Sequence, residues 1–206
     1  MLPLALLGAF FGGTGAGGGD SSGDGSDDHG NQTGTADADI LNGTTGVDSI
    51  YGYQGDDTLT GNTGDDTLVG GSGDDVLDGG GGRDALYGGS GDDTLSGGAW
   101  DDRLFGDVGA DALNGGTGND QLLGGLGNDV LNGGEDTFIL DVAQGVDRIT
   151  DFNRNSDQLQ LDDPTIPLSD ISVTDWANGE GADVFIRGAL VARVTGAAGL
   201  SAAQLF

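Results

Sequence analysis

The chain of 206 residues has no cysteine and no lysine, and it has a single histidine, His29. Without cysteine there can be no disulfide framework, no thiolate metal site and no cysteine nucleophile. With one histidine and no lysine, the usual pairs of catalytic base and nucleophile cannot be assembled. Motifs for nucleotide binding, serine hydrolysis and zinc proteolysis are also missing from the sequence. These absences predict a protein that is not an enzyme.

Positive charge and apolar residues are both scarce. Six arginines stand against 35 acidic residues, so the net charge is −29. Such a charge repels nucleic acid and attracts cations, and no nucleic-acid partner is expected. Hydrophobic residues make up only 35% of the chain, whereas glycine accounts for 45 residues. Something other than a large apolar core must therefore hold the ordered part together.

The composition divides the chain into four regions. Residues 1–11 are apolar, residues 12–33 are a flexible linker rich in Gly, Ser and Asp, residues 34–132 are a repeat array, and residues 133–206 alternate as strands do. The segment 1–11 has no basic region and no clear Ala-x-Ala cleavage site, and it is short for a transmembrane helix. Three interpretations of it stay open: an anchor, a weak signal, or a plug that covers the first coil.

The array consists of eleven units of nine residues without an insertion. Position 1 is always glycine, position 8 is Leu in ten units and Ile50 in the other, and position 4 is glycine except at Asp37 and Trp100. Position 6 is always aspartate, and these candidate metal ligands are Asp39, Asp48, Asp57, Asp66, Asp75, Asp84, Asp93, Asp102, Asp111, Asp120 and Asp129. A fixed period of this kind indicates stacked structural units.

Each unit reads as a turn followed by a short strand. Glycines at positions 1–6 favour a tight turn, and the pattern x-Leu-x at positions 7–9 places Leu on one face of a strand. Two units would close one coil, with stacked strands forming parallel sheets around a thin column of Leu. One apolar side chain per unit buries little surface, and the stacked aspartates repel one another. A ligand that removes this repulsion is therefore predicted to be part of the fold.

Calcium suits the predicted turns best. Ca²⁺ takes six to eight oxygen ligands, which carboxylates and the carbonyls of glycine turns supply. Zinc and copper favour His or Cys, which the array lacks. The array holds 19 Asp, no Glu and two Arg, a net charge of −17. Ions placed between each turn and the turn two units later would number several, up to about nine.

These units resemble the Gly-Gly-x-Gly-x-Asp-x-Leu-x nonapeptide of the RTX, or haemolysin-type calcium-binding, repeat. The resemblance implies an all-β fold, a right-handed parallel β-roll capped by a C-terminal β-structured region. It implies that position-6 aspartates two units apart share a Ca²⁺ ion, as Asp57 would with Asp75. It also implies a secreted, extracellular bacterial protein that is exported by type I secretion machinery and folds on binding Ca²⁺ outside the cell.

The C-terminal region extends the resemblance. Residues 133–138 resemble a final unit shortened by two residues, and the segments 136–141 and 147–152 resemble the region after the repeats in serralysin-type proteins. The tail, residues 199–206, resembles the C-terminal signal of type I secretion substrates. Further short strands are expected at 157–161, 171–176, 182–186 and 190–194.

Some positions depart from the repeat or suggest other functions. The sequence predicts a weakened turn at Trp100, an outward-pointing Arg83 and a capping role for the first unit. Tyr51, Tyr87 and Phe105 stand at position 9 and should face outward. Two alternatives to a stand-alone calcium-binding protein stay open: a surface-associated adhesion or matrix spacer, and an accessory polysaccharide-binding module of an extracellular enzyme system.

Overall fold

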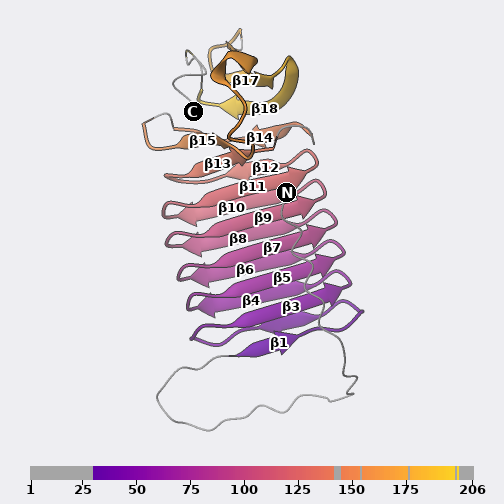
Figure 1. The fold of residues 1–206 in the computed structure, drawn as a ribbon. Helices are drawn as coiled ribbons and strands as arrows, with labels where there is room; N and C mark the ends of the chain where they lie inside the picture. Colours follow the sequence, from indigo (N-terminus) through magenta and orange to yellow (C-terminus); the bar gives the residue numbers. More distant parts are fainter. Residues whose placement is uncertain (1–29, 142–144, 154, 176, 198, 200–206) are drawn as a thin grey trace.

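In a computed structural model, residues 30–141, 145–153, 155–175, 177–197 and 199 are described. They form a roll of two parallel sheets with a β-structured cap at its C-terminal end (Figure 1). The predicted apolar segment 1–11, most of the predicted linker and the tail after Gly199 lie outside the described residues. Within the described part of the chain, no helix is long and apolar enough to cross a membrane.

Alternate strands belong to opposite sheets. The eight-stranded sheet runs, in spatial order, β1 (Asn31–Thr33), β3 (Ser49–Gln54), β5 (Thr67–Ser72), β7 (Ala85–Ser90), β9 (Arg103–Val108), β11 (Gln121–Leu126), β13 (Thr137–Leu140) and β15 (Gln158–Leu161). The ten-stranded sheet runs β2 (Ile40–Asn42), β4 (Thr58–Thr63), β6 (Val76–Gly81), β8 (Thr94–Ala99), β10 (Ala112–Thr117), β12 (Val130–Asn132), β14 (Asp147–Ile149), β18 (Ala189–Thr195), β17 (Gly181–Ile186) and β16 (Ile171–Asp175).

The register of the strands confirms the predicted coil. Leu59 pairs with Leu77 in one sheet and Leu68 pairs with Leu86 in the other, so each partner lies two units further along the chain. Each coil therefore contains two units of the repeat, one strand in each sheet. The all-β fold and the parallel β-roll predicted from the sequence are confirmed.

The strands are longer than predicted. A typical strand contains six residues, from position 7 of one unit to position 3 of the next, so the turn occupies only positions 4–6. From the third unit onward, position 2 lies inside the strand but has positive φ, whether it is Gly89 (φ 113°) or Tyr53 (φ 79°). The glycines that suggested a long turn are thus partly strand residues. Residues Asn31–Thr33, at the end of the predicted linker, form β1.

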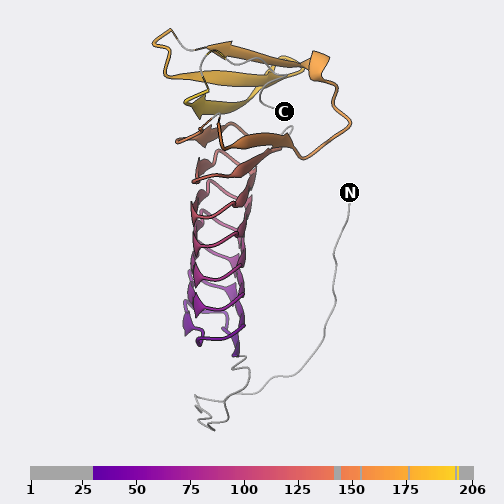
Figure 2. The ribbon, with the colours of Figure 1, turned by 90° about the vertical axis from the view of Figure 1, so that its left-hand side faces the viewer.

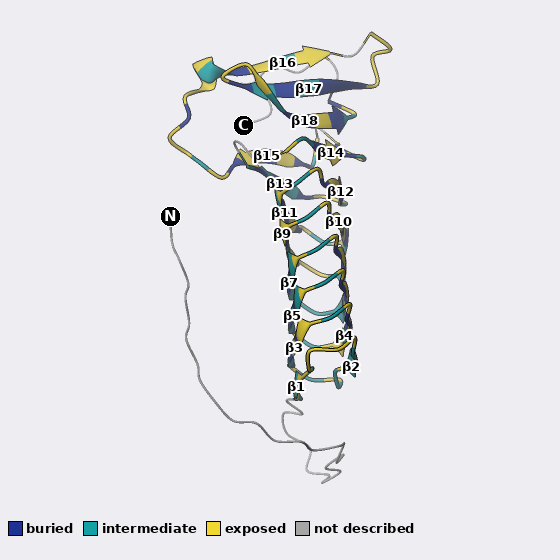
Figure 3. Cartoon of the chain, turned by 90° about the vertical axis from the view of Figure 1, so that its right-hand side faces the viewer, coloured by how far each residue is buried: buried dark blue, intermediate teal, exposed yellow. Residues whose placement is uncertain are grey.

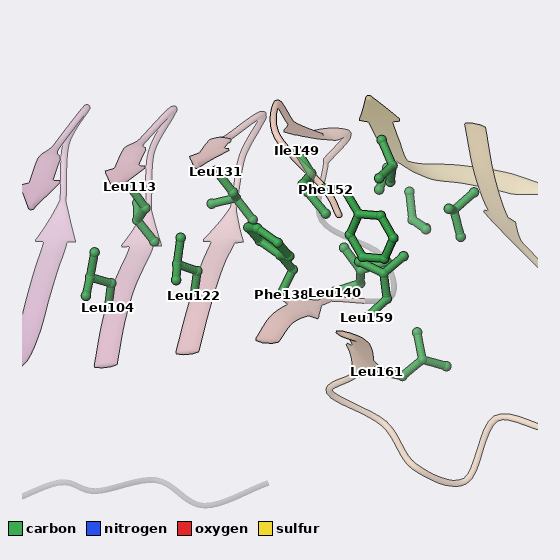
Figure 4. Packing of buried hydrophobic residues seen from close by; sticks show 14 of the residues in the cluster. Leu104, Leu113, Leu122, Leu131, Phe138, Leu140, Ile149, Phe152, Leu159 and Leu161 are labelled. Atoms are coloured by element: carbon green, nitrogen blue, oxygen red, sulfur yellow. The ribbon is translucent and has the colours of Figure 1, made fainter. Parts of the chain in front are cut away.

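The core of the roll is a double column of position-8 side chains. From Ile50 to Leu131 these side chains are at most 2% exposed. Figure 4 shows Leu104 and Leu122 of the eight-stranded sheet pointing toward Leu113 and Leu131 of the ten-stranded sheet. Leu41, in the first coil, is only partly buried because no earlier coil covers it.

The end of the array passes directly into the cap. Leu122 pairs with Phe138, whereas two full units would have placed its partner at Leu140, and this confirms the shortened final unit. The strands β16, β17 and β18 form an antiparallel meander, and β18 joins it to the roll by pairing in parallel with β14. The four additional strands expected from the sequence are present as β15 to β18. Figures 2 and 3 show the segment between β15 and β16 projecting beyond the eight-stranded sheet.

Candidate metal-binding turns

The position-6 aspartates stand at the ends of the turns, immediately before the strands. Ten of them, from Asp48 to Asp129, are at most 2% exposed, and Asp39 in the first coil is partly buried. Their burial follows from the alternation of the strand that comes next. Because position 8 points into the core, position 6 points to the same side two residues earlier.

One carboxylate oxygen of each aspartate links neighbouring coils. The backbone N–H of Asp57 donates to Asp75 Oδ1 at 2.7 Å, and the N–H of Asp66 donates to Asp84 Oδ1 at 2.8 Å. The same bond recurs at 2.7–2.9 Å from Asp39 to Asp111. The structure therefore places aspartates two units apart side by side, while the sharing of an ion between them stays a prediction.

The other carboxylate oxygen, Oδ2, is buried without a hydrogen-bond partner in nine units. These are Asp57, Asp66, Asp75, Asp84, Asp93, Asp102, Asp111, Asp120 and Asp129. A buried polar atom without a partner costs about 1–3 kcal/mol, and more if it is charged. Nine such atoms in one regular array are therefore difficult to explain unless a ligand contacts them.

The unpartnered oxygens point at the position-1 glycines. A Cβ atom added to Gly97 would lie 2.5 Å from Asp102 Oδ2 and 2.7 Å from the carbonyl oxygen of Gly115. The carboxylate oxygen of one unit and the glycine carbonyl oxygen two units later therefore border the same small space. Position-1 glycines are absent from the residues with positive φ, so their invariance reflects the lack of room for a side chain.

This donor set fits calcium. It contains only oxygen atoms, as a hard cation prefers. Among the described residues, no group of three or more His, Cys, Asp or Glu side chains is gathered closely enough to hold a metal. Carbonyl oxygens or water must therefore complete the coordination of any bound ion. The oxygen atoms of the described turns fit Ca²⁺ better than a metal that needs nitrogen or sulfur.

The first two units differ from the other nine. Asp39 Oδ2 accepts hydrogen bonds from the N–H and hydroxyl of Thr35, and Asp48 Oδ2 accepts them from the N–H and hydroxyl of Thr44. The repeat pattern by itself makes all eleven aspartates equivalent. The signal that separates them is threonine at position 2, which occurs only in these two units.

Three aspartates beyond the array continue the two columns. The N–H of Asp120 donates to Asp136 Oδ1 at 2.8 Å, that of Asp129 to Asp147 Oδ1 at 3.4 Å, and that of Asp136 to Asp157 Oδ1 at 3.3 Å. All three are buried. Asp136 and Asp157 were missed because the spacing changes there to 16 and 21 residues. Asp147 keeps the regular two-unit spacing and is followed by Ile149 at the position of the core Leu.

Burial and mutual repulsion raise the pKa of the position-6 aspartates in the middle of the array, from Asp75 to Asp111. Burial, reinforced by neighbouring aspartates, raises the pKa of Asp93 and of Asp102 to about 7. The same causes raise the pKa of Asp75, Asp84 and Asp111 to about 6. The ionised form is therefore unfavourable in the roll alone, and a bound cation would favour it.

The outward orientation predicted for Arg83 and for the position-9 aromatic residues is present in the structure, while the weakened turn at Trp100 stays a prediction. Trp100 has φ 86° and is 64% exposed, so the bulky residue does occupy a left-handed position. Arg83 points outward, with its Nε 3.7 Å from Asp101 Oδ2. Tyr51 is 39% exposed, and Tyr87 and Phe105 are partly exposed on the same sheet.

A parallel β-roll with buried carboxylates and carbonyl oxygens in every turn belongs to the class of calcium-binding solenoids. The family model of the RTX calcium-binding nonapeptide repeat matches residues 33–68, 60–95, 87–122 and 105–137. These matches cover just over half of the chain. The chain therefore belongs to the RTX calcium-binding repeat family.

Among solved structures, the chain is similar to the extracellular lipase LipA from Serratia marcescens. The two are 21% identical, with a TM-score of 0.44, over 85% of this chain and 39% of that chain. The chain thus corresponds to less than half the length of the lipase. No curated protein matches this chain.

Proposed function

We propose that this chain is a secreted, non-catalytic protein whose β-roll folds as it binds several Ca²⁺ ions in its turns after export. The observation that carries the proposal is the row of nine buried, unpartnered Oδ2 atoms facing carbonyl oxygens. Ca²⁺ would supply the positive charge and the coordination that these oxygens lack. The position-6 aspartates would hold the ions, together with carbonyls of the position-1 glycines.

The proposal couples metal binding to folding. The carboxylate and carbonyl oxygens that border one candidate site come from successive coils. The site is therefore complete only when the coils are stacked. Ligands that bind only the folded state stabilise it by mass action. A calcium-poor environment would leave the roll unfolded, and a calcium-rich one would fold it.

The experiment is a far-UV circular dichroism titration of the purified chain with Ca²⁺, with Mg²⁺ as the control. We expect β signal to appear cooperatively with Ca²⁺ and only weakly with Mg²⁺, because Mg²⁺ needs stricter octahedral geometry and retains its water. A roll already folded in chelator, or still unfolded at millimolar Ca²⁺, would contradict the proposal.

A matched pair of variants tests the ligands. Asp93 has a buried, unpartnered Oδ2, whereas the adjacent Asp92 is exposed. D93N removes a proposed ligand and should raise the Ca²⁺ midpoint about tenfold, equivalent to ~1.4 kcal/mol. D92N should change it by less than about twofold, since exposed carboxylates contribute little. Equal effects of the two substitutions would remove the position-6 aspartates from the binding role.

Export and the alternative functions are supported by fewer observations than calcium binding is. The tail that resembles a type I secretion signal lies outside the described residues, apart from Gly199. Polysaccharide binding stays a prediction, and the outward aromatics give it little support. Tyr87 and Phe105 stack with ring centroids 4.9 Å apart and planes 6° apart, so those ring faces cover each other rather than a sugar. A surface spacer would use the same calcium-dependent roll.

A further inference from the structure

The two outer faces of the roll differ in chemistry at position 9. On the eight-stranded sheet, consecutive registered partners form one apolar row: Tyr51, Val69, Tyr87, Phe105, Leu123 and Ile139. On the ten-stranded sheet, the corresponding residues are all polar: Asn42, Thr60, Asp78, Ser96, Asn114 and Asn132. The repeat alone does not require this difference, because both rows occupy the same position of the unit.

The apolar row lies on a face that is almost without charge. The five strands β3, β5, β7, β9 and β11 contain one arginine and one aspartate, Arg103 and Asp107. Tyr51 is 39% exposed and Tyr53 55% exposed, and the remaining members of the row are partly exposed. On a chain with a net charge of −29, a continuous apolar face of this kind indicates a contact surface.

The row leads into an apolar hollow under the cap. Ile139 pairs with Gln160 of β15, and Gln160 lines a hollow together with Leu159, Leu161, Pro164, Ile166 and Leu168. Part of this lining belongs to the segment between β15 and β16, which projects over the same side of the roll (Figures 2 and 3). The projection limits access for a bulky partner at this end, whereas a single extended segment could lie beneath it.

We propose that residues 1–11 of this chain lie along this face once the roll has folded. The segment Met-Leu-Pro-Leu-Ala-Leu-Leu-Gly-Ala-Phe-Phe is apolar and uncharged, as the face is. Extended, it spans about 36 Å, which exceeds the roughly 24 Å covered by the six strands that carry the row, β3 to β13. The described chain begins at Gly30, beside β1, which is the edge strand of the same sheet.

The stretch between residues 1–11 and β1 is long enough for residues 1–11 to reach the apolar row. A Gly-rich stretch the length of residues 12–29 has a typical end-to-end distance of roughly 21–25 Å, and the midpoint of the row lies about 17 Å from β1. Tethering gives an effective concentration in the millimolar range, so modest apolar contact suffices. A second copy is a weaker candidate because two chains of charge −29 repel each other.

The cysteine-free chain allows the placement to be tested by engineered disulfides. Leu6→Cys is combined with Val69→Cys or Leu123→Cys on the apolar row. The matched controls combine it with Thr60→Cys or Asn114→Cys, which hold position 9 of the neighbouring units on the opposite sheet. In Ca²⁺ we expect at least one row pair to form an intramolecular disulfide tenfold faster than both controls. In chelator all pairs should react at similar rates.

Each other outcome overturns the proposal. Equal rates for row and control pairs in Ca²⁺ would show that the segment does not prefer this face. Disulfides between two chains would assign the face to a second copy. Loss of residues 1–11 from the exported protein would identify them as a cleaved signal.

A further variant separates this proposal from the folding proposal on which it rests. Phe105→Asn introduces the residue type that Asn114 already provides on the opposite sheet, so the roll should fold. It should reduce the crosslinking rate of the row pairs to that of the controls, while the Ca²⁺-dependent circular dichroism is retained. Unchanged crosslinking would contradict docking on this face, and a missing calcium response in the unsubstituted chain would instead contradict the proposed function.

Discussion

The roll and the cap bury different groups to reach an ordered state. From the second unit onward, each nine-residue unit of the roll buries one core side chain, such as Leu95, and one carboxylate, such as Asp93. In the cap, two neighbouring strands bury a dense apolar set: Ala182, Val184, Ile186, Val191, Ala192 and Val194. All the buried, unpartnered side-chain oxygens of the described chain lie in the roll. Apolar burial is thus sparse in the roll, where the proposed Ca²⁺ ions would contribute stability, and dense in the cap.

The largest expected difference between roll and cap appears when calcium is removed. In chelator, amide hydrogen exchange should accelerate by several orders of magnitude across Leu59–Leu131, because nine carboxylates lose their counter-charge. The amides of β17 and β18 should retain part of their protection. Simultaneous loss in both regions at one Ca²⁺ concentration would show that roll and cap are a single cooperative unit.

A second prediction compares two glycines of one unit. A Cβ at Gly79 would lie 2.5 Å from Asp84 Oδ2 and 2.8 Å from the Gly97 carbonyl, whereas a Cβ at Gly81 would meet nothing within 4 Å. G79A should therefore destabilise the calcium-loaded roll by about 2 kcal/mol or more, and G81A should stay within about 0.5 kcal/mol of the unsubstituted chain. Thermal unfolding in Ca²⁺ measures both. Similar losses for the two variants would mean that the space beside position 1 is not specially restricted.

The third prediction concerns pH in the absence of metal. The pKa of Asp93 is about 7 in the roll, while an unfolded aspartate has a pKa of about 3.9. Between these values the folded state binds more protons, so the stability of the metal-free roll falls as pH rises. Lowering the pH from 7.5 to 5 in chelator should increase the β signal. In Ca²⁺, the same change should raise the midpoint because protons compete for the carboxylates.

Those two titrations are complementary. A β signal in chelator that is flat or falls toward pH 5 would contradict the raised pKa of the buried aspartates. D93N removes one of the groups whose pKa is raised and should weaken the pH dependence.

The smallest expected effect lies at Trp100. Its φ of 86° is strained for a bulky residue, and its side chain is 64% exposed. W100G should relieve roughly 1–2 kcal/mol of backbone strain, offset by about 1 kcal/mol of glycine flexibility in the unfolded chain. A small gain, up to about 1 kcal/mol in thermal unfolding, is expected. A clear loss would show that Trp100 makes contacts that stabilise its turn.

Much of the roll could be predicted because its determinants recur at fixed spacing. The Leu column, the aspartate column and the coil of two units all follow from the period of the repeat, and the structure has them. The six-residue strands could not be predicted, because glycine at positions 1–3 indicates a turn locally. Only pairing with the coils on either side makes these residues part of a strand.

The candidate site was predicted in outline and missed in detail. Asp136 and Asp157 lie where the period is broken, so counting in nines could not reach them. The hydrogen bonds from Thr35 to Asp39 and from Thr44 to Asp48 depend on a local backbone conformation that the repeat does not specify. The cap has no period at all, and its strands were found only from their alternation of apolar and polar residues.

The pairing of alternate units gives the chain a parity. Each strand of the array pairs only with strands two units away, as Val69 does with Tyr87. An insertion or deletion of two whole units would therefore lengthen or shorten the roll by one coil and leave the chemistry of both faces unchanged. Insertion or deletion of a single unit would instead move every earlier unit to the opposite sheet. The apolar row would then be divided between the two faces. The distinction between the faces is thus maintained only if the array gains or loses its units in pairs.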